Sequence, residues 1–144
     1  MVIERGQEKY YADALQLVRN FYNEALKEYD KTLDEQYLLS NFDKYKSNAF
    51  LLIIEDKCEG ILAGLSVTTP LNNQKIFEEV IWYVNKPFRK YGVQMLKEAQ
   101  KALKEEGYTT MVIALMHNSK TEKLAKFYEG QGFKPFETHY LRQL

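Results

Sequence analysis

A short basic segment in the second half of the chain has the composition of an anion-binding turn. It reads Val-Asn-Lys-Pro-Phe-Arg-Lys-Tyr-Gly-Val over residues 84–93 and leads from a strand pattern into a helix pattern. Free N–H groups and the positive end of the helix dipole attract phosphate at such a start. Arg89 and Lys90 add full charges, and Gly92 lets the backbone approach a ligand. The segment predicts phosphate binding, and an ordinary strand-to-helix connection with solvated charges is the alternative.

A second segment places a tyrosine at the end of a predicted helix. Residues 125–133 read Ala-Lys-Phe-Tyr-Glu-Gly-Gln-Gly-Phe, and Asn118 precedes them. A phenol has a pKa of about 10 and stays protonated at neutral pH, so Tyr128 can donate a proton to a leaving group. The alternative is a core tyrosine whose hydroxyl donates to a backbone carbonyl.

The remaining reactive residues predict little chemistry. His117 and His139 have no metal-ligand spacing to each other or to Cys58, so no metal site is expected. His117 is a further candidate base because it lies beside Asn118. Cys58 falls in a predicted turn and is not expected to be a nucleophile, and Trp82 is expected in the core.

Hydrophobic periodicity supplies the elements that must position these residues. Helical spacing over residues 9–27 is followed by a second helix through residue 42, with Thr32 or Asp34 as its cap. Strands are predicted at 2–4, 50–54, 61–69, 77–84, 109–116 and 133–141, further helices at 92–106 and 119–129, and turns at 56–60 and 70–73. The order βααβββαβαβ predicts an α/β fold with a mixed sheet, because hairpins demand antiparallel pairing and a strand–helix–strand unit suits a parallel crossover.

Length and charge limit the classes of function. The 144 residues, 45% hydrophobic and 28% charged, predict a single globular domain over residues 1–144. Twenty basic and 20 acidic residues cancel, which argues against a nucleic-acid partner. Residues 1–72 hold 8 basic and 12 acidic residues and residues 73–144 the reverse, so the second half favours an anionic ligand unless the split is chance.

Three further features bear on location and packing. No run of about 18 apolar residues is present and the first residues lack a signal-peptide core, so no membrane association is expected. A single cysteine fits a reducing, cytoplasmic location. Of 11 tyrosines, six lie in the first 45 residues; most are expected to be packing residues and a few to line a site.

The two segments, in this order and on this framework, resemble the GNAT superfamily of acyl-CoA-dependent N-acetyltransferases. The sequence WYVNKPFRKYG stands where the family has a strand, a turn and R-x-x-G-x-G/A, and N…AKFYEGQGF stands where it has N…LYxxxGF. The motifs cover about residues 76–136, and the element order covers the chain. The ending GFKPFETHYLRQL is similar to small bacteriophage members of the family.

The resemblance implies a sheet splayed open after its fourth strand, with acetyl-CoA in the cleft and no metal. It implies direct acetyl transfer to an amine through a tetrahedral intermediate. By position, the pyrophosphate falls to backbone amides of Arg89, Lys90, Tyr91, Gly92 and Val93. Tyr83 and Val84 would pair with the pantetheine arm and polarise the thioester carbonyl, Asn118 would contact that arm, and Tyr128 would protonate the departing thiolate.

The resemblance also implies a base at Glu78 or Glu79. Adjacent residues of a strand point to opposite faces, so only one can face the cleft. Glu79 is preferred here because Ile81 and Tyr83 continue its face.

The loop departs from the family pattern. Gln94 replaces the last small residue if Gly92 is the first glycine; if Gly92 is the last, the loop is short and Lys90 replaces a glycine. Either alignment removes amide donors, which Lys86, Arg89 and Lys90 could offset.

Several hypotheses follow for partners. The acceptor is expected at the first two helices and the hairpin, where acidic residues suit a cationic amine, small or on a protein. A catalytically inactive GNAT-fold binding protein, phage-encoded and directed at a host protein, is the alternative, and an unrelated small-molecule site is a third hypothesis. A homodimer would use residues 133–141 as its edge.

Overall fold

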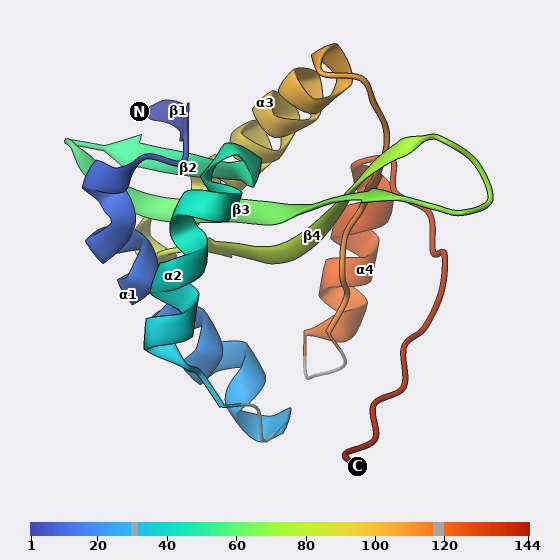
Figure 1. Cartoon of the computed structure of the whole chain (residues 1–144), viewed down its shortest axis with the longest axis horizontal. Coiled ribbons are helices and arrows are strands. Elements are labelled where there is room, and N and C mark those ends of the chain that lie inside the picture. Colours follow the sequence, from blue (N-terminus) through green and yellow to red (C-terminus); the bar gives the residue numbers. More distant parts are fainter. Residues whose placement is uncertain (30–31, 117–119) are drawn as a thin grey trace. The chain divides into compact units, whose positions relative to one another are not determined.

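The computed structural model describes residues 1–29, 32–116 and 120–144, which form two compact units, Met1–Ala114 and Leu115–Leu144. The first unit contains one sheet with its strands side by side in chain order (Figure 1). Its strands are β1 (Val2–Arg5), β2 (Ala49–Ile54), β3 (Lys57–Thr68), β4 (Lys75–Val84) and β5 (Tyr108–Val112). Pairs from β1 to β4 are antiparallel and β5 is parallel to β4, which confirms the predicted mixed sheet.

Helices connect these strands close to the predicted positions. The first helical stretch runs without a break from Glu8 to Tyr29, and α3 begins directly after a 3-10 helix. The segments are η1 (Glu8–Tyr10), α1 (Tyr11–Phe21), the π-helix η2 (Tyr22–Leu26), η3 (Lys27–Tyr29), α2 (Glu35–Tyr45), η4 (Lys46–Asn48), η5 (Lys86–Tyr91) and α3 (Gly92–Glu105). Asp34, not Thr32, caps α2: its carboxylate accepts the Tyr37 N–H at 3.0 Å, a contact that stabilises a helix by about 1 kcal/mol.

The sheet is covered on both faces, α1 and α2 on one and α3 on the other (Figure 1). Alternation along β2 sends Leu51 and Ile53 into a core with α1, whereas Phe50 and Leu52 point to the other face. The buried α3 residues Met95, Leu96, Ala99 and Leu103 recur at helical spacing and form one stripe. Burial on both faces explains why β2 reads as an unbroken apolar run.

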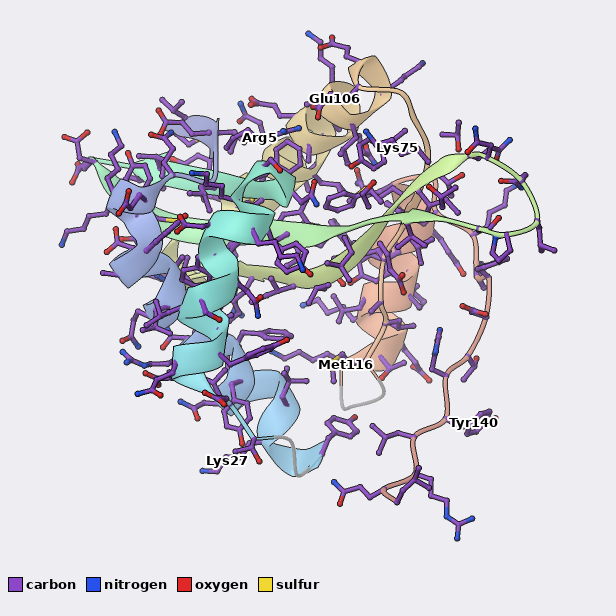
Figure 2. The ribbon with its side chains drawn as sticks, viewed as in Figure 1. Arg5, Lys27, Lys75, Glu106, Met116 and Tyr140 are labelled. Atoms are coloured by element: carbon purple, nitrogen blue, oxygen red, sulfur yellow. The ribbon has the colours of Figure 1, made fainter. Side chains whose placement is uncertain are left out.

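The hairpin between β2 and β3 is tighter than predicted. Glu55 and Asp56 have φ values of +50° and +64°, as a two-residue hairpin turn of the primed type requires, so β3 begins at Lys57 and not at residue 61. At the opposite end of the sheet, Arg5 on β1 forms an ion pair with Glu106 at the end of α3 (Figure 2). The turn and the ion pair lie at opposite ends of β2, and neither involves β4.

A bulge in β4 changes which face its residues occupy. Ala63 pairs with Ile81 and Gly64 pairs with Glu79, so Val80 is an extra residue in β4. Ala63 and Gly64 are consecutive and point to opposite faces, so their partners Ile81 and Glu79 also point to opposite faces. Glu79 therefore lies on the face that α3 covers.

The pairing of β4 with β5 ends early. The last pair is Glu78 with Val112, and β4 continues to Val84 without β5. This confirms the sheet splayed after its fourth strand. The predicted strand to residue 116 is too long, because residues beyond Val112 have no β4 hydrogen bonds to keep them in the sheet.

The second unit contains α4 (Thr121–Gly130), close to the predicted helix over 119–129. Its end is a Schellman motif: the Phe133 N–H donates to the Tyr128 carbonyl and the Gly132 N–H to that of Glu129, each at 3.0 Å. Gly132 has φ +91°, which favours glycine at this position. The ring of Phe133 lies 6.1 Å from that of Tyr128, which completes the motif.

The predicted strand over residues 133–141 is wrong. Residues 133–144 form no strand, and Phe136 and Tyr140 are 81% and 95% exposed. An extended segment becomes a strand only where a neighbour supplies hydrogen bonds, and none is paired with it here. The homodimer hypothesis therefore loses the edge strand on which it depended and stays a prediction.

In the part of the chain that the structure describes, no helix has both the length and the apolar character needed to cross a membrane.

We expect Gly64→Ala to destabilise the first unit by about 1–3 kcal/mol, because an added Cβ would lie 2.3 Å from the Glu78 carbonyl and 2.8 Å from the Phe77 ring. Urea unfolding measures the change in the free energy of unfolding. Gly92→Ala is the control, since its Cβ would meet only the Trp82 ring at an ordinary 3.7 Å. Equal losses from the two substitutions would contradict the steric account of the bulge.

Candidate active site

The free half of β4, from Glu79 to Val84, contains or adjoins in sequence the predicted site residues of the first unit. Its outer edge has no β5 partner within Met1–Ala114. Such an edge presents backbone N–H and C=O groups that an extended ligand containing amides can pair with. The strand therefore has the geometry to bind a linear substrate arm alongside it.

Glu79 lies at the point where β4 and β5 separate. Burial raises the pKa of its carboxyl group to about 7, and a hydrogen bond from the Ala114 backbone N–H acts in the opposite direction. Ala114 follows shortly after the end of β5, so this contact spans the opening between the two strands. A carboxyl group that titrates near neutral pH is suited to accept a proton from an incoming group.

Glu78 and Glu79 lie on opposite faces, as predicted, but the reason for preferring Glu79 is wrong. Ile81 and Tyr83 do not continue its face, because the extra residue Val80 reverses the alternation between them. Glu78 pairs with Leu65 and lies, exposed, on the same face as Ile81. The role of either carboxylate as a base stays a prediction.

A polar network fixes the end of β4. The Tyr83 hydroxyl donates to Glu24 at 2.9 Å, and Arg89 Nη2 lies 3.1 Å from the same carboxylate. Burial acts to raise the pKa of Glu24, but the hydrogen bonds from Tyr83 and Arg89 outweigh it and lower the pKa. Burial and Glu24 together raise the pKa of Tyr83, so its hydroxyl stays a donor. Glu24 comes from the π-helix η2, a turn that is often found at functional sites.

Asn85 anchors the turn that follows β4. Its N–H donates to the Glu59 carbonyl at 2.9 Å and its side-chain amide to the Glu59 carboxylate at 2.8 Å. Asn20 on α1 donates to the Asn85 side chain at 3.2 Å. Glu59 is itself the extra residue of a second bulge, between the pairs Leu52–Gly60 and Ile53–Cys58. Three hydrogen bonds, to Glu59 of β3 and from Asn20 of α1, thus hold one residue in place.

The predicted phosphate-binding segment is wound more tightly than an open loop. Residues 86–91 form the 3-10 helix η5, whose hydrogen bonds join an N–H to a carbonyl three residues earlier, as from Phe88 to Asn85 at 2.9 Å. The Gly92 N–H donates to the Arg89 carbonyl, and the Arg89 Nε donates to the Val84 carbonyl at 2.9 Å. The Gly92 amide and the Arg89 side chain are therefore engaged within the chain, and the phosphate-binding role predicted for this segment stays a prediction.

Two cations remain available at the start of α3. Lys86 is 73% exposed, and its ammonium forms a long ion pair with the Glu24 carboxylate at 3.8 Å. Lys90 is exposed, and its ammonium lies 5.1 Å from the centre of the Tyr91 ring. Tyr91 is the N-cap residue of α3, and Val93 is half-buried in its first turn. Two lysines and a helix N-terminus give this corner a positive potential.

Tyr128 lies in the last turn of α4, as predicted. Its half-buried ring is 6.0 Å from that of Phe127, and its carbonyl belongs to the Schellman motif. Asn118 and His117 lie outside the described residues. Burial raises the pKa of the Cys58 thiol to about 12, so it supplies no thiolate at neutral pH.

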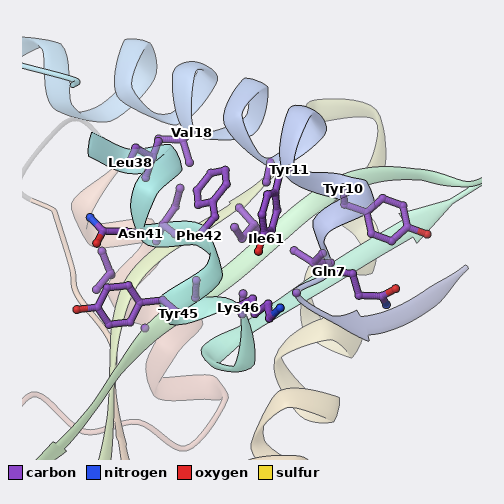
Figure 3. Close-up of a pocket in the computed structure, with 18 of the residues that line it drawn as sticks. Gln7, Tyr10, Tyr11, Val18, Leu38, Asn41, Phe42, Tyr45, Lys46 and Ile61 are labelled. Carbon is purple, nitrogen blue, oxygen red and sulfur yellow. The ribbon is translucent and has the colours of Figure 1, made fainter. Parts of the chain in front are cut away.

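A pocket of about 350 Å³ between α1, α2 and the sheet is a feature that the sequence analysis did not find (Figure 3). Three of the six early tyrosines, Tyr10, Tyr11 and Tyr45, line it. Tyrosine content was the one sequence signal for it, and that content alone does not separate packing residues from pocket residues. Val80 and Ile81 also line the pocket, which brings it to the bulge of β4.

The chain shares its fold with solved acetyltransferases. The model of the acetyltransferase (GNAT) family matches residues 13–133. The ribosomal-protein-alanine N-acetyltransferase of Brucella melitensis biovar Abortus 2308 is 14% identical, with a TM-score of 0.77 over 99% of this chain and 98% of that one. An aminoglycoside acetyltransferase, meta-AAC0020, from an uncultured soil metagenomic sample, in complex with sisomicin, is 17% identical, with a TM-score of 0.74 over 99% and 95%.

The aminoglycoside N-acetyltransferase AAC(6')-Iy in complex with CoA is 10% identical, with a TM-score of 0.75 over 99% of this chain and 93% of that one. No curated protein sequence matches the chain. At these identities the solved structures establish the fold.

Glu79→Gln tests the burial of this carboxyl group through stability. Folded Glu79 keeps its proton up to about pH 7, whereas the unfolded chain releases it near 4.5, so folding takes up a proton between these values. Stability is then full below about pH 4.5 and falls as the pH rises to 7, by up to about 3 kcal/mol. We expect Glu79→Gln to remove this slope in urea unfolding measured from pH 5 to 8.

Glu78→Gln is the matched control, because Glu78 is exposed on the other face and should leave the slope in place. A slope that survives Glu79→Gln would show that another group causes it.

Proposed function

The chain belongs to the acetyltransferase (GNAT) family, and on that premise we propose that it moves an acetyl group from acetyl-CoA to a primary amine by direct transfer. The observation that carries the proposal is the free half of β4 with Glu79 at its start, a carboxyl group with a pKa of about 7. The proposal treats residues 1–144 as one acetyltransferase domain. The acceptor is a small molecule or a protein amine.

The edge of β4 is proposed to hold the pantetheine arm through its backbone, with Tyr83 and Val84 as the pairing residues. Tyr83 suits this role because its side chain is held by Glu24 and its main chain pairs with Ile61 of β3. One of the free N–H groups of this edge would polarise the thioester carbonyl.

The phosphates of the co-substrate fit the positive corner at the start of α3. Lys86 and Lys90 supply exposed charge, and the amides of Tyr91 and Val93 lie at the helix N-terminus. Arg89 takes a different part in this proposal from the one first predicted: held by Glu24 and the Val84 carbonyl, it positions the corner.

The chemistry needs one base and one acid. Glu79 accepts a proton from the acceptor ammonium, and the freed nitrogen forms a bond to the acetyl carbon, giving a tetrahedral intermediate. The carbon–sulfur bond then breaks, and Tyr128 donates its proton to the departing thiolate. The nitrogen, which still carries two protons after the attack, releases one of them through water to the Tyr128 phenolate, which leaves a neutral amide and CoA thiol. Direct transfer is supported by Cys58, the chain's one cysteine, because its pKa of about 12 excludes an acetyl-cysteine route at neutral pH.

A second candidate function is a binding protein that keeps the fold without catalysis. It is favoured by the winding of residues 86–91 and by the Gly92 N–H, which donates to Arg89. This candidate predicts no affinity for CoA. Titration calorimetry with acetyl-CoA and CoA distinguishes the two candidate functions, because an absence of binding heat at millimolar ligand would overturn the proposed acetyl transfer.

The other expectations from the sequence stay predictions. They are a cytoplasmic location, a bacteriophage source and the absence of nucleic-acid, membrane and metal partners.

We expect turnover to rise with pH through about 7 as Glu79 loses its proton. Glu79→Gln should lower turnover by about 10²–10⁴-fold and remove this rise. CoA release from acetyl-CoA with a panel of primary amines, measured across this pH range, gives both values. If Glu78→Gln and not Glu79→Gln removes the rise, Glu78 is the base.

Tyr128→Phe removes only the phenolic hydroxyl and should lower turnover by about 10²-fold or more while keeping the rise near pH 7. Glu129→Gln is the control, since Glu129 is the exposed neighbour of Tyr128. Full activity of Tyr128→Phe would exclude the phenol as the acid.

A further inference from the structure

The pocket between α1, α2 and the sheet has the size of a small-molecule site. Its volume of about 350 Å³ falls in the range of about 300–1,000 Å³ that is usual for such sites. A dry cavity of about 150 Å³ already holds benzene. The space therefore suits one or two rings or a branched aliphatic group.

The pocket exists because small residues face it. Ala14 on α1 and Ala49 and Ala63 on the sheet line it, where larger side chains would fill the space.

The walls are aromatic and aliphatic. Figure 3 shows Tyr11 and Val18 projecting from α1, and Leu38 and Phe42 from α2, toward one another. The rings of Tyr11 and Phe42 are 5.1 Å apart, and the Tyr11 hydroxyl donates to Asp43 at 2.5 Å. Asp43 does not line the pocket, so the hydroxyl is engaged elsewhere while the ring forms the wall.

The lining carries almost no charge. Lys46 is the one charged side chain among the lining residues, all of which the structure describes, and no carboxylate is present. A polycationic amino sugar needs carboxylates or carbonyls to replace the water around each ammonium group. This lining offers instead apolar surface, which rewards an apolar ligand.

The pocket reaches the proposed reaction edge. Val80, the extra residue of β4, lines it and follows Glu79 directly. Val80 is 58% exposed, so the pocket is open at this point. Glu79 lies on the other face of the sheet, so an amine that reaches both must lie at the edge of β4 that has no β5 partner.

We propose that this pocket binds the apolar body of the acceptor, and that the acceptor is a primary amine carrying an aromatic or branched aliphatic group. The inference rests on the proposed acetyl transfer. It replaces the expectation of a cationic acceptor chosen by acidic residues, since the charge of the amine is met at the edge of β4 and its selectivity arises from apolar volume.

Acetylation of four amines tests the inference: 2-phenylethylamine, isoamylamine, ethanolamine and kanamycin. We expect kcat/KM for the first two to exceed that for ethanolamine by about 10–100-fold, the gain of burying one large apolar group. A preference for kanamycin or ethanolamine would overturn the inference and leave the proposed function standing.

Ala63→Leu fills the pocket and sharpens the test. We expect it to lower kcat/KM for 2-phenylethylamine by about 10-fold or more, to leave that for ethanolamine within about 2-fold, and to keep or raise the unfolding midpoint. Val18→Phe fills the pocket from α1 and serves if Ala63→Leu does not fold. Ala12→Leu, exposed on α1 and outside the lining, is the control. Equal losses for all amines would contradict a pocket that selects the acceptor.

Saturation-transfer NMR with 2-phenylethylamine gives a readout that does not need turnover. Binding that Ala63→Leu abolishes, with no acetylation of any amine, would overturn the proposed function and keep the pocket as an apolar ligand site. Acetylation of 2-phenylethylamine with binding unchanged by Ala63→Leu and Val18→Phe would overturn the pocket and keep the function.

Discussion

The arrangement of the site depends on one extra residue, Val80, in the middle of β4. Because Gly64 lies against the Phe77 ring and the Glu78 carbonyl with no room for a side chain, the strands pass closely here and β4 bulges. The bulge sends Glu79 to one face and Ile81 to the other, where Ile81 joins the core with α1. One register shift therefore separates a carboxyl group with a raised pKa from the apolar wall of a pocket, although the two are neighbours in sequence.

Beyond the end of the β4–β5 pairing, β4 is held on one edge only, by β3, so its position depends on further contacts. Such contacts lie at its far end: Glu24 holds Tyr83 and Arg89, and Glu59 holds Asn85. These groups tie β4 to the π-helix and to β3 in place of the missing strand. The consequence for ligand binding is that the Arg89 guanidinium is engaged by Glu24 and the Val84 carbonyl, so Lys86 and Lys90 supply the positive charge for an anion.

Periodicity predicted the elements whose partners are local. The amphipathic pattern over 9–27, the β2–β3 hairpin and the helix after Gly92 are all present near their predicted bounds. A bulge leaves no trace in a strand segment such as Phe77-Glu78-Glu79-Val80-Ile81, since it depends on what lies across the sheet. The strand predicted over 133–141 is wrong for the same reason: its aromatic residues are typical of strands, but a strand forms only where a neighbouring strand supplies hydrogen bonds. The winding of residues 86–91 was likewise hidden, because Arg89 suits a phosphate and Glu24 equally well.

The acidic residues of the first half of the chain explain why the proposed acceptor is selected by the shape of an apolar pocket and not by charge. Four of their carboxylates are engaged within the fold: Asp13 accepts the Cys58 N–H, Asp34 caps α2, Glu35 pairs with Arg19, and Asp43 accepts the Tyr11 hydroxyl. Each interaction turns a charge away from the pocket or neutralises it, and the pocket lining is left without a carboxylate. The net charge of −4 over residues 1–72 therefore includes carboxylates that form contacts within the fold. The same helices that carry the charge present apolar rings to the sheet, and the space among those rings is what an acceptor meets.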